Sequence, residues 1–526
     1  MSQSLNKEFG FFRSFFWPIH RQELRKLLPM LFILFLICFN YSILRNMKDS
    51  LVITSSGAAV IPFIKVWVML PTAVLLTYVF TRLSNRFSQE RVFYIMVTMF
   101  LLFFALFAFV LYPLRDLLHP VELAASLETW LPSGFKGFIA MCCNWSFTGF
   151  YVLCELWSTA IMTVLFWGFA NEITTVSEAK RFYGVLGVGA SCAAIFAGQI
   201  ANLLSRPEWW IVNEMNSQEV WGRTIQILVS VVILAGIAAM LLFRWMSRNV
   251  LTDACFEAFH SRARSRSQGI KKKLSIKDSF SYISNSKYLI CISLLVVSYN
   301  LVINMTEVLW KDQLARLYPS PTDYNIYMNN LTSAIGLFAT FTALFMAKII
   351  ENLGWTRTAM ITPLMIVLTC IGFFSFFLWQ DHWSSIFPVL MGSTTPLAIA
   401  VFFGAAQNCL SKAAKYSVFD ATKEMTFIPL EHDCKLKGKA AIDGIGSRVG
   451  KSGGSLLYQG LLLFCGTIGG SAPYVALILA IVVCIWIFSV RLLGKQFDML
   501  VNSQNTGSPP PSHDWIPTSP PQPAQS

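Results

Sequence analysis

The sequence predicts an all-α integral membrane protein with about twelve transmembrane helices in two halves of six. Three observations lead to this prediction. The chain is 55% hydrophobic and only 13% charged, whereas an ordinary soluble domain is about 25% charged. Apolar runs of about 20 residues, the length that crosses a bilayer, recur along the chain. The basic residues are concentrated in alternate loops, as the positive-inside rule requires of a multi-pass membrane protein.

Twelve apolar stretches are long enough to cross a membrane. Region 137–173 is apolar enough either for one long helix or for a half-buried segment followed by a span. We expect spans at residues 27–47, 60–81, 91–112, 145–173, 183–203, 222–244, 287–310, 329–349, 358–379, 386–411, 446–466 and 474–494.

Lysines and arginines orient these spans. Residues 1–26 carry five of them and residues 244–287 carry ten, whereas loops 380–385 and 467–473 carry none. Both termini and the central linker are therefore expected on the cytoplasmic side. Residues 1–26 contain no cleavable hydrophobic region and are too short for a transit peptide, which favours a bacterial inner membrane.

The chain divides at its basic linker. We expect a cytoplasmic N-terminal segment (1–26), a six-helix half (27–249), the linker (250–286), a second six-helix half (287–500) and a disordered Pro/Ser-rich tail (501–526). Such a tail cannot pack a core.

The two halves resemble each other. Residues 165–184 align with 401–420, and Lys48-Asp49 near the end of the first span recurs as Lys311-Asp312 near the end of the seventh. Halves of six spans share one orientation, so the repeat is parallel, as in the major facilitator fold. In that architecture the substrate site lies between the halves near the middle of the membrane.

Several classes of function are disfavoured. The stretch GIGSRVGKSGGS (444–455) ends like a phosphate-binding P-loop, but three or five residues separate its earlier glycines from the final Gly-Lys-Ser where the motif needs four. The linker is too short for an ATPase domain. The net charge of +13 follows from topology, so no nucleic-acid partner is expected. The scattered cysteines indicate neither a disulfide framework nor a zinc site, and we expect no metal or cofactor.

Charged side chains inside the spans are the candidate functional residues, because each costs about 2.5–3.5 kcal/mol to insert. Lys451 stands among four glycines near a helix start, where an anion is favoured, and structural pairing is its alternative. Lys48 and Lys311 could instead snorkel to the membrane surface, and Arg448 could be an ordinary topological charge. The candidate carboxylates are Glu155 and Glu307, which could pair with a lysine, accept from a ribose or amino group, or carry a proton.

Three asparagines are candidates for contacts to a nucleobase or ribose. Asn144, Asn300 and Asn304 lie in or beside the fourth and seventh spans, and Asn304 lies one helical turn before Glu307. An interhelical hydrogen bond is the alternative for each of them.

The segments LRNMKDSL, CELW, FWGFANEITTVSEAKRFYG, MTEVLWKDQL and, above all, KEMTFIPLEHDCKLKGKAAIDGIGSRVGKSGG resemble the non-mitochondrial ATP/ADP carriers of plastids and intracellular bacteria. The resemblance covers residues 25–495. It implies an antiporter that imports external ATP in exchange for cytoplasmic ADP, with or without phosphate. It also implies that Lys48, Glu155, Glu307 and Lys451 are important for transport, with the lysines holding phosphates. The expected partners are therefore ATP, ADP and the lipid bilayer, and the expected functional form is a monomer.

Two further functions compete with exchange. A proton-coupled nucleoside-triphosphate importer would use the same scaffold, and the lysines and glutamates alone do not separate it from an exchanger. A sugar or peptide facilitator would have the same fold, but a sugar would not require so many buried lysines.

Overall fold

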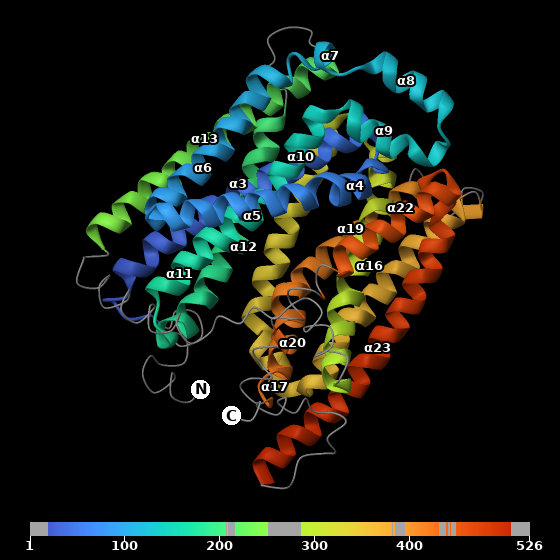
Figure 1. Ribbon diagram of the computed structural model, residues 1–526. Coiled ribbons are helices and arrows are strands. Elements are labelled where there is room, and N and C mark those ends of the chain that lie inside the picture. The colour runs from blue at the N-terminus through green and yellow to red at the C-terminus, as the bar shows by residue number, and fades with distance from the viewer. Residues whose placement is uncertain are drawn as a thin grey trace, which may run out of the picture. The chain divides into compact units, whose positions relative to one another are not determined.

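The computed structural model describes residues 19–206, 208, 216–250, 286–380, 382–383, 395–430, 438–439, 442, 446 and 449–506. Within these ranges every regular element is helical (Figure 1). The chain forms two compact units. The first holds the described parts of Met1–Leu131, Lys136–Lys271 and Tyr318–Leu344, and the second holds those of Pro132–Phe135, Lys272–Leu317 and Phe345–Ser526.

The first unit contains five long helices and several short ones, with π-helical segments (η1, η2, η4) continuing some of them. Helices α6 and α13 lie side by side, and α3 packs against α10, α12 and α13 (Figure 1). The elements are α3 (Leu24–Ser56), α4 (Val60–Phe63), η1 (Ile64–Val68), α5 (Met69–Arg86), α6 (Gln89–Leu106), η2 (Phe107–Leu111), α7 (Arg115–Leu118), α8 (Val121–Trp130), α9 (Lys136–Cys143), α10 (Trp145–Trp157), η4 (Ser158–Phe166), α11 (Trp167–Ile173), α12 (Val176–Ser205), α13 (Ser217–Asn249) and the first part of α17 (Pro321–Leu378).

The second unit is built around α16, which packs against α19, α22 and α23. Its elements are η3 (Ser133–Phe135), α16 (Lys287–Leu317), the remainder of α17, α19 (Pro396–Ala414), η6 (Lys415–Phe419), α20 (Asp420–Thr426), η8 (Val449–Gly453), α22 (Gly454–Cys465) and α23 (Ile468–Thr506).

Ten helical stretches in the described part of the chain are long and apolar enough to span a membrane, and each overlaps one predicted span. The other two predicted spans do not meet that criterion there. Residues 329–349 lie inside α17, and residues 446–466 fall partly outside the described residues. The all-α membrane fold is confirmed, whereas the count of twelve stays a prediction.

The fourth predicted span begins where the sequence left two alternatives. Helix α9 ends at Cys143, and a continuous helical stretch then runs from Trp145 to Ile173. Asn144 separates them with φ −91° and ψ 48°, a conformation outside the helical region. The alternative of a short segment followed by a span is therefore the correct one.

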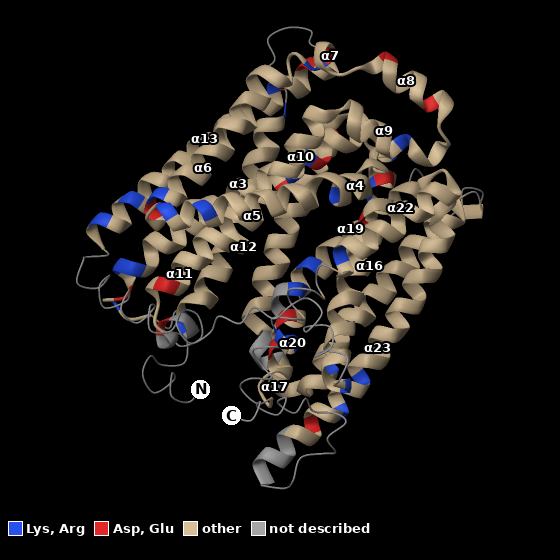
Figure 2. Cartoon of the chain, viewed as in Figure 1, with Lys and Arg blue, Asp and Glu red and all other residues tan. Residues whose placement is uncertain are grey.

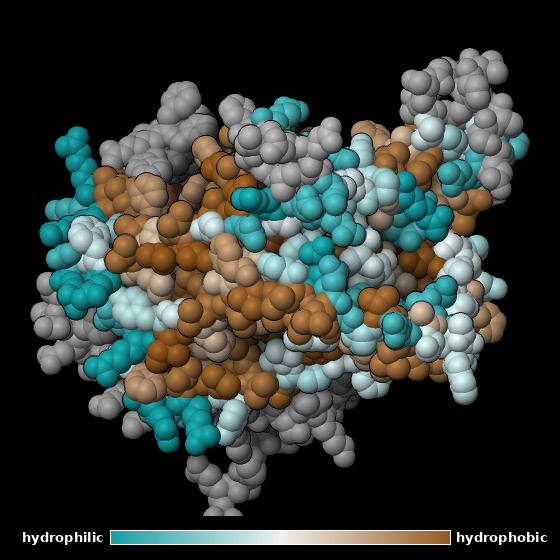
Figure 3. All heavy atoms as spheres, turned by 90° about the horizontal axis from the view of Figure 1, so that it is seen from above, coloured by the Kyte–Doolittle hydropathy of each residue, from teal (hydrophilic) through white to brown (hydrophobic). Residues whose placement is uncertain are grey.

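Charge and hydropathy follow the pattern expected for membrane helices. Long stretches of α6, α13 and α23 carry no charged residue, and their charges gather toward the helix ends (Figure 2). Large hydrophobic side chains are exposed, among them Leu241 on α13 and Phe488 on α23. Figure 3 shows hydrophobic residues over much of the face that it presents. In a bilayer these side chains face acyl chains and carry no hydration cost.

The N-terminal ends of α3 and α12 are joined by ion pairs. Lys26 Nζ lies 2.9 Å from the Glu178 carboxylate, and Arg181 pairs with Glu23. Glu178 and Thr175 also form a capping box at the start of α12. Burial tends to raise the pKa of Glu178, but hydrogen bonds from Thr175 and Lys26 outweigh it and hold that pKa below its usual value.

A polar seam joins the first part of α17 to α3 and α12 within the first unit. Asn46 Nδ2 donates to Asn329 Oδ1 at 2.8 Å, and Asn202 Nδ2 donates to Asn330 Oδ1 at 2.7 Å. The α17 members recur at intervals of three and four residues, so they share one helix face. The seam consists of Asn46, Ser50, Gln199, Asn202, Ser205, Asn325, Asn329, Asn330, Thr332 and Ser333.

Helix α17 bends at Gly354, whose φ of 74° and ψ of 170° only glycine adopts without strain. The boundary between the two compact units falls within α17, between Leu344 and Phe345, so the first part of α17 belongs to the first unit. The division into two six-helix halves remains a prediction from the sequence. Most of segment 1–26, residues 251–285 of the linker 250–286 and residues 507–526 of the tail 501–526 lie outside the described residues.

Candidate functional site

Lys48 and Glu155 meet in the first unit, as the sequence allowed. Lys48 Nζ lies 2.9 Å from Asp49 Oδ1 and 3.3 Å from Glu155 Oε2. The ammonium also lies 3.8 Å from the centre of the Tyr151 ring, close enough for a cation–π interaction. We call Lys48, Asp49, Tyr151 and Glu155 the Lys48 cluster.

Lys48 does not snorkel to the membrane surface. Its side chain is 3% exposed, and α3 continues for eight residues beyond it to Ser56. The helix can continue because the carboxylates of Asp49 and Glu155 supply the counter-charge that a buried ammonium needs. Lys311 does not snorkel either, because its side chain is 3% exposed and its helix continues to Leu317.

Glu155 is the more exposed carboxylate of the Lys48 cluster. The Glu155 side chain is 33% exposed, against 1% for Asp49. Arg45 and Lys65 add positive potential at Glu155. A polyanion approaching here would meet Lys48, Arg45 and Lys65 and would compete with Glu155 for their charge.

Asn144 lies beside this region at the start of α10. Its Nδ2 donates to Ser56 Oγ at 2.7 Å, where α3 ends. The side chain therefore joins two elements in this structure, and a contact to a base or ribose would have to replace that hydrogen bond.

Glu307 is the centre of a second charged group. Glu307 Oε1 lies 3.3 Å from Lys311 Nζ on the same helix and 3.4 Å from Lys412 Nζ on α19. We call these three residues the Glu307 cluster. One carboxylate here serves two ammonium groups, so a phosphate could take over either ammonium without leaving Glu307 unpaired.

The lysine and the glutamate change places between the two clusters. In the first unit the lysine lies on α3 and its glutamate on α10; in the second unit the glutamate lies on α16 and its lysine on α19. By sequence these are the first and fourth predicted spans of each half. A tryptophan also joins the two helices of each cluster. Trp157 Nε1 on α10 donates to Ile37 O on α3 at 3.2 Å, and Trp310 Nε1 on α16 donates to Val401 O on α19 at 3.1 Å.

Polar side chains line a narrow cleft beside Glu307, between α16 and α19. Gln407 Nε2 donates to Thr306 Oγ1 at 3.4 Å. The buried Asn408 Oδ1 accepts no hydrogen bond within the described structure. A buried acceptor without a donor costs about 1–3 kcal/mol, and the cleft, with a volume of about 10 Å³, has room for about one water beside Asn408. The cleft is lined by Ile303, Thr306, Glu307, Trp310, Gly404, Gln407, Asn408 and Ser411.

Gly404 permits the close contact that forms this cleft. A Cβ at Gly404 would lie 2.2 Å from Trp310 Cδ1, and Trp310 is held by its hydrogen bond to Val401. We expect Gly404→Ala to lower the melting temperature of the purified protein, because such overpacking costs about 1–3 kcal/mol. At Gly168, its equivalent in the repeat, a Cβ would meet no described atom within 4 Å. Gly168→Ala is therefore the matched control, and equal melting of the two variants would contradict the prediction.

Lys451 lies in η8 with an exposed side chain. Its backbone carbonyl accepts from Asn304 Nδ2 at 2.9 Å, and the same amide donates to Ser455 Oγ at 2.8 Å. A Cβ at Gly450 would lie 2.8 Å from Asn300 Cβ, so this glycine serves close helix approach. Asn304 thus holds the segment that carries Lys451, and Asn300 donates to Val296 O within its own helix at 2.8 Å.

Arg448 lies outside the described residues. In the part of the chain that the structure does describe, no three His, Cys, Asp or Glu side chains gather as a metal site requires.

Sequence reasoning missed several members of these groups. Lys412 lies in a segment aligned between the halves, but it was not selected as an intramembrane charge because it falls just beyond the predicted span 386–411. Asp49 was recognised as part of a repeated pair and not as the partner of Lys48. Tyr151 and Asn408 carry no local pattern that separates them from packing residues.

Comparisons with known proteins agree over nearly the whole chain. A family model described as TLC ATP/ADP transporter matches residues 2–497. ADP,ATP carrier protein 1 of Chlamydia pneumoniae is 43% identical over 500 residues, covering 94% of this chain and 96% of the relative. ADP,ATP carrier protein 1 of Rickettsia bellii is 40% identical, covering 93% and 97%. A chloroplastic ADP,ATP carrier protein 1 of Arabidopsis thaliana is 40% identical, covering 91% and 74%.

Solved structures share the fold at low sequence identity. A D-xylose–proton symporter matches with a TM-score of 0.54 and 10% identity, covering 90% of this chain and 97% of that one. A bacterial homologue of the iron transporter ferroportin matches with a TM-score of 0.52 and 11% identity, covering 89% and 100%. These likenesses establish a major-facilitator-type fold.

Proposed function

Because the chain belongs to the TLC ATP/ADP transporter family, we propose that it imports external ATP in exchange for cytoplasmic ADP. The observation that carries this proposal is the pair of charged clusters inside membrane helices. Each holds an ammonium that is 3% exposed, Lys48 or Lys311, against a carboxylate that a polyanion can displace. A sugar or an uncharged nucleoside would not require such groups.

The transport step is proposed to be secondary and driven by exchange. Ammonium groups inside a membrane protein are costly unless a counter-charge accompanies them. A nucleotide with three or four negative charges supplies that counter-charge, so the loaded carrier changes conformation more readily than the empty one. We propose Lys48, Lys311, Arg448 and Lys451 as the phosphate ligands and Glu155 and Glu307 as the groups that hold the lysines when no nucleotide is bound.

Recognition of the base and ribose is assigned to polar side chains beside these clusters. Asn144, Asn300 and Asn304 each make a hydrogen bond within the protein in this structure. A contact to the nucleotide would therefore require that the hydrogen bond within the protein be broken. Asn408, with its unsatisfied Oδ1, would lose no hydrogen bond and is the residue that we add to the set, although its cleft of about 10 Å³ must widen to admit a base or ribose.

We further propose a bacterial inner-membrane location with both termini cytoplasmic, because the loops rich in lysine and arginine alternate with loops that lack them. A monomer suffices for this mechanism, since both clusters are supplied by one chain. Neither nucleic acid nor a bound cofactor has a role in it.

Uptake into proteoliposomes tests the proposal. Vesicles loaded with ADP are expected to accumulate labelled ATP, and vesicles without internal nucleotide are not. Equal uptake by empty vesicles would reject exchange. Uptake that depends on an imposed pH gradient would instead identify the proton-coupled nucleoside-triphosphate importer.

A second experiment addresses the polar seam. If the two six-helix halves predicted from the sequence move against each other, the contact of α12 with α17 must open during transport. We expect exchange to stop when Asn202→Cys and Asn330→Cys are joined by a short bis-maleimide, which adds to both thiols, in a background without native cysteines.

The matched control joins two helices of one predicted half. Thr98 Oγ1 donates to Met240 Sδ at 3.7 Å, which links α6 to α13 at an exposed position. Cross-linking Thr98→Cys to Met240→Cys should leave exchange unaffected. Continued transport by the cross-linked Asn202/Asn330 pair would show that the seam does not open.

A further inference from the structure

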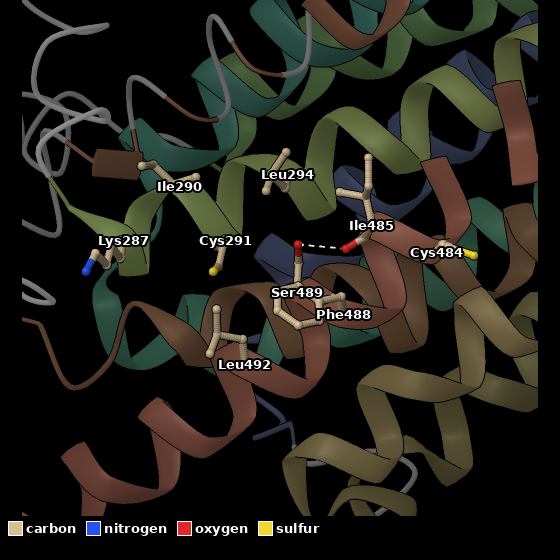
Figure 4. Close-up of a pocket in the computed structure, with 9 residues that line it drawn as sticks. All are labelled: Lys287, Ile290, Cys291, Leu294, Cys484, Ile485, Phe488, Ser489 and Leu492. Carbon is tan, nitrogen blue, oxygen red and sulfur yellow. Dashed lines mark hydrogen bonds between the residues drawn. The ribbon is translucent and has the colours of Figure 1, made fainter. Parts of the chain in front are cut away.

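Figure 4 shows a groove between α16 and α23, and none of its lining residues belongs to either charged cluster. Its volume is about 410 Å³, within the range of about 300–1,000 Å³ typical of ligand sites. We call it the α16–α23 groove. It is lined by Lys287, Ile290, Cys291, Leu294, Cys484, Ile485, Phe488, Ser489 and Leu492.

The interior of the groove is suited to a hydrocarbon chain. Most of its lining side chains are aliphatic, aromatic or thiol groups. The Ser489 hydroxyl donates to Ile485 O at 2.8 Å, a bond drawn in Figure 4, so it is satisfied within its own helix. Phe488 is 67% exposed and Ile485 is 42% exposed. Because α16 and α23 both qualify as membrane spans, these exposed side chains face lipid.

Positive charge gathers at one end of the groove. Figure 4 shows Lys287 and Leu492 toward one end and Cys484 toward the other. Lys495 lies three residues beyond Leu492 and seven beyond Phe488, so it continues the same face of α23. Lys287 and Lys495 are both exposed.

The charge balance at this end favours an anion. Arg491, one turn before Lys495, is also exposed, and Asp498 is the acidic residue that follows within the next turn. The three basic side chains outnumber this carboxylate. Basic pockets between transmembrane helices bind anionic lipid head groups.

We propose that the α16–α23 groove binds an anionic phospholipid. One acyl chain lies along Leu294, Ile485 and Phe488, and the phosphate of the head group contacts Lys287 and Lys495. The apolar groove alone would not select this molecule, because bulk acyl chains are as apolar as the groove. Selection must come from the charged end, with the groove holding the chain at a fixed position.

The test is lipid binding to the full-length protein in mild detergent after removal of copurified lipid. Native mass spectrometry would count bound phosphatidylglycerol, with phosphatidylcholine of the same acyl chains and inorganic phosphate as the comparison ligands. One tightly bound phosphatidylglycerol per chain is expected. The double variant Lys287→Gln/Lys495→Gln should weaken its binding by about tenfold or more. Leu294→Trp, which fills the groove and keeps every charge, should weaken it as well.

The matched control removes two basic residues from the end of another membrane helix. Arg244 and Arg248 are exposed at the end of α13, and Arg244→Gln/Arg248→Gln should leave binding of phosphatidylglycerol unchanged. Melting temperatures without added lipid would show that all variants are folded. Three results would overturn the proposal: equal binding of phosphatidylcholine, equal weakening by the α13 control, or displacement of the lipid by inorganic phosphate at comparable concentration.

Discussion

Lys48→Ala is expected to reduce ATP/ADP exchange by about 100-fold or more, the largest effect of any single substitution in the chain. Loss of the ammonium leaves Asp49 and Glu155 without their shared counter-charge, and removing one partner of a buried pair costs about 3–5 kcal/mol. It also removes a proposed phosphate ligand. Exchange in ADP-loaded proteoliposomes measures the effect.

Two further variants separate the phosphate role of Lys48 from its role in folding. Lys48→Ala/Asp49→Asn removes the ammonium together with the more buried of its two carboxylates and should recover much of the lost stability, but not transport. Lys26→Ala, which breaks an ion pair at the end of the same helix, should keep exchange within about twofold because that pair is partly exposed. An unchanged Kd for ATP in Lys48→Ala would remove Lys48 from the phosphate site.

Glu307→Gln is expected to tighten nucleotide binding and to slow exchange. The carboxylate competes with phosphate for Lys311 and Lys412, so its neutralisation leaves both ammonium groups to the ligand. We expect the Kd for ATP to fall by about tenfold, equivalent to ~1.4 kcal/mol, and the turnover number to fall by a similar factor because release becomes slower. Equilibrium binding in detergent and exchange rates in proteoliposomes measure the two effects.

Asp312→Asn provides the comparison for Glu307→Gln. Asp312 lies on the same helix and pairs with Arg316 at 3.0 Å, and Arg316 is 58% exposed. Kd and turnover should both stay within about twofold. Weaker ATP binding in Glu307→Gln would show that Glu307 contacts the ligand directly and does not compete with it.

The sequence predicted the fold well because membrane helices have a strong signal. Ten of the predicted spans coincide with long apolar helices among the described residues, although several of these helices run further than predicted. The error at Lys48 is instructive, because the Lys-Asp pair was interpreted as the end of a span. The helix continues past the pair because its charges satisfy each other and Glu155, a tertiary fact that hydropathy does not contain.

The candidate site was only partly predictable for the same reason. A lysine or glutamate within an apolar run is visible in sequence, which identified Lys48, Lys311 and Glu307. The importance of Lys412 depends on α19 lying against α16, and the importance of Asn408 depends on its Oδ1 lacking a donor in the described structure. Neither fact can be obtained from the sequence without knowing how the helices pack.

The two clusters have a consequence for the symmetry of the carrier. A perfectly duplicated transporter would offer its substrate two equivalent poses, one the flipped image of the other. Here Glu155 on α10 faces a lysine on α3, whereas Glu307 on α16 faces Lys412 on α19. The halves are therefore not interchangeable in the placement of their charges, and we expect a bound nucleotide to have one preferred orientation.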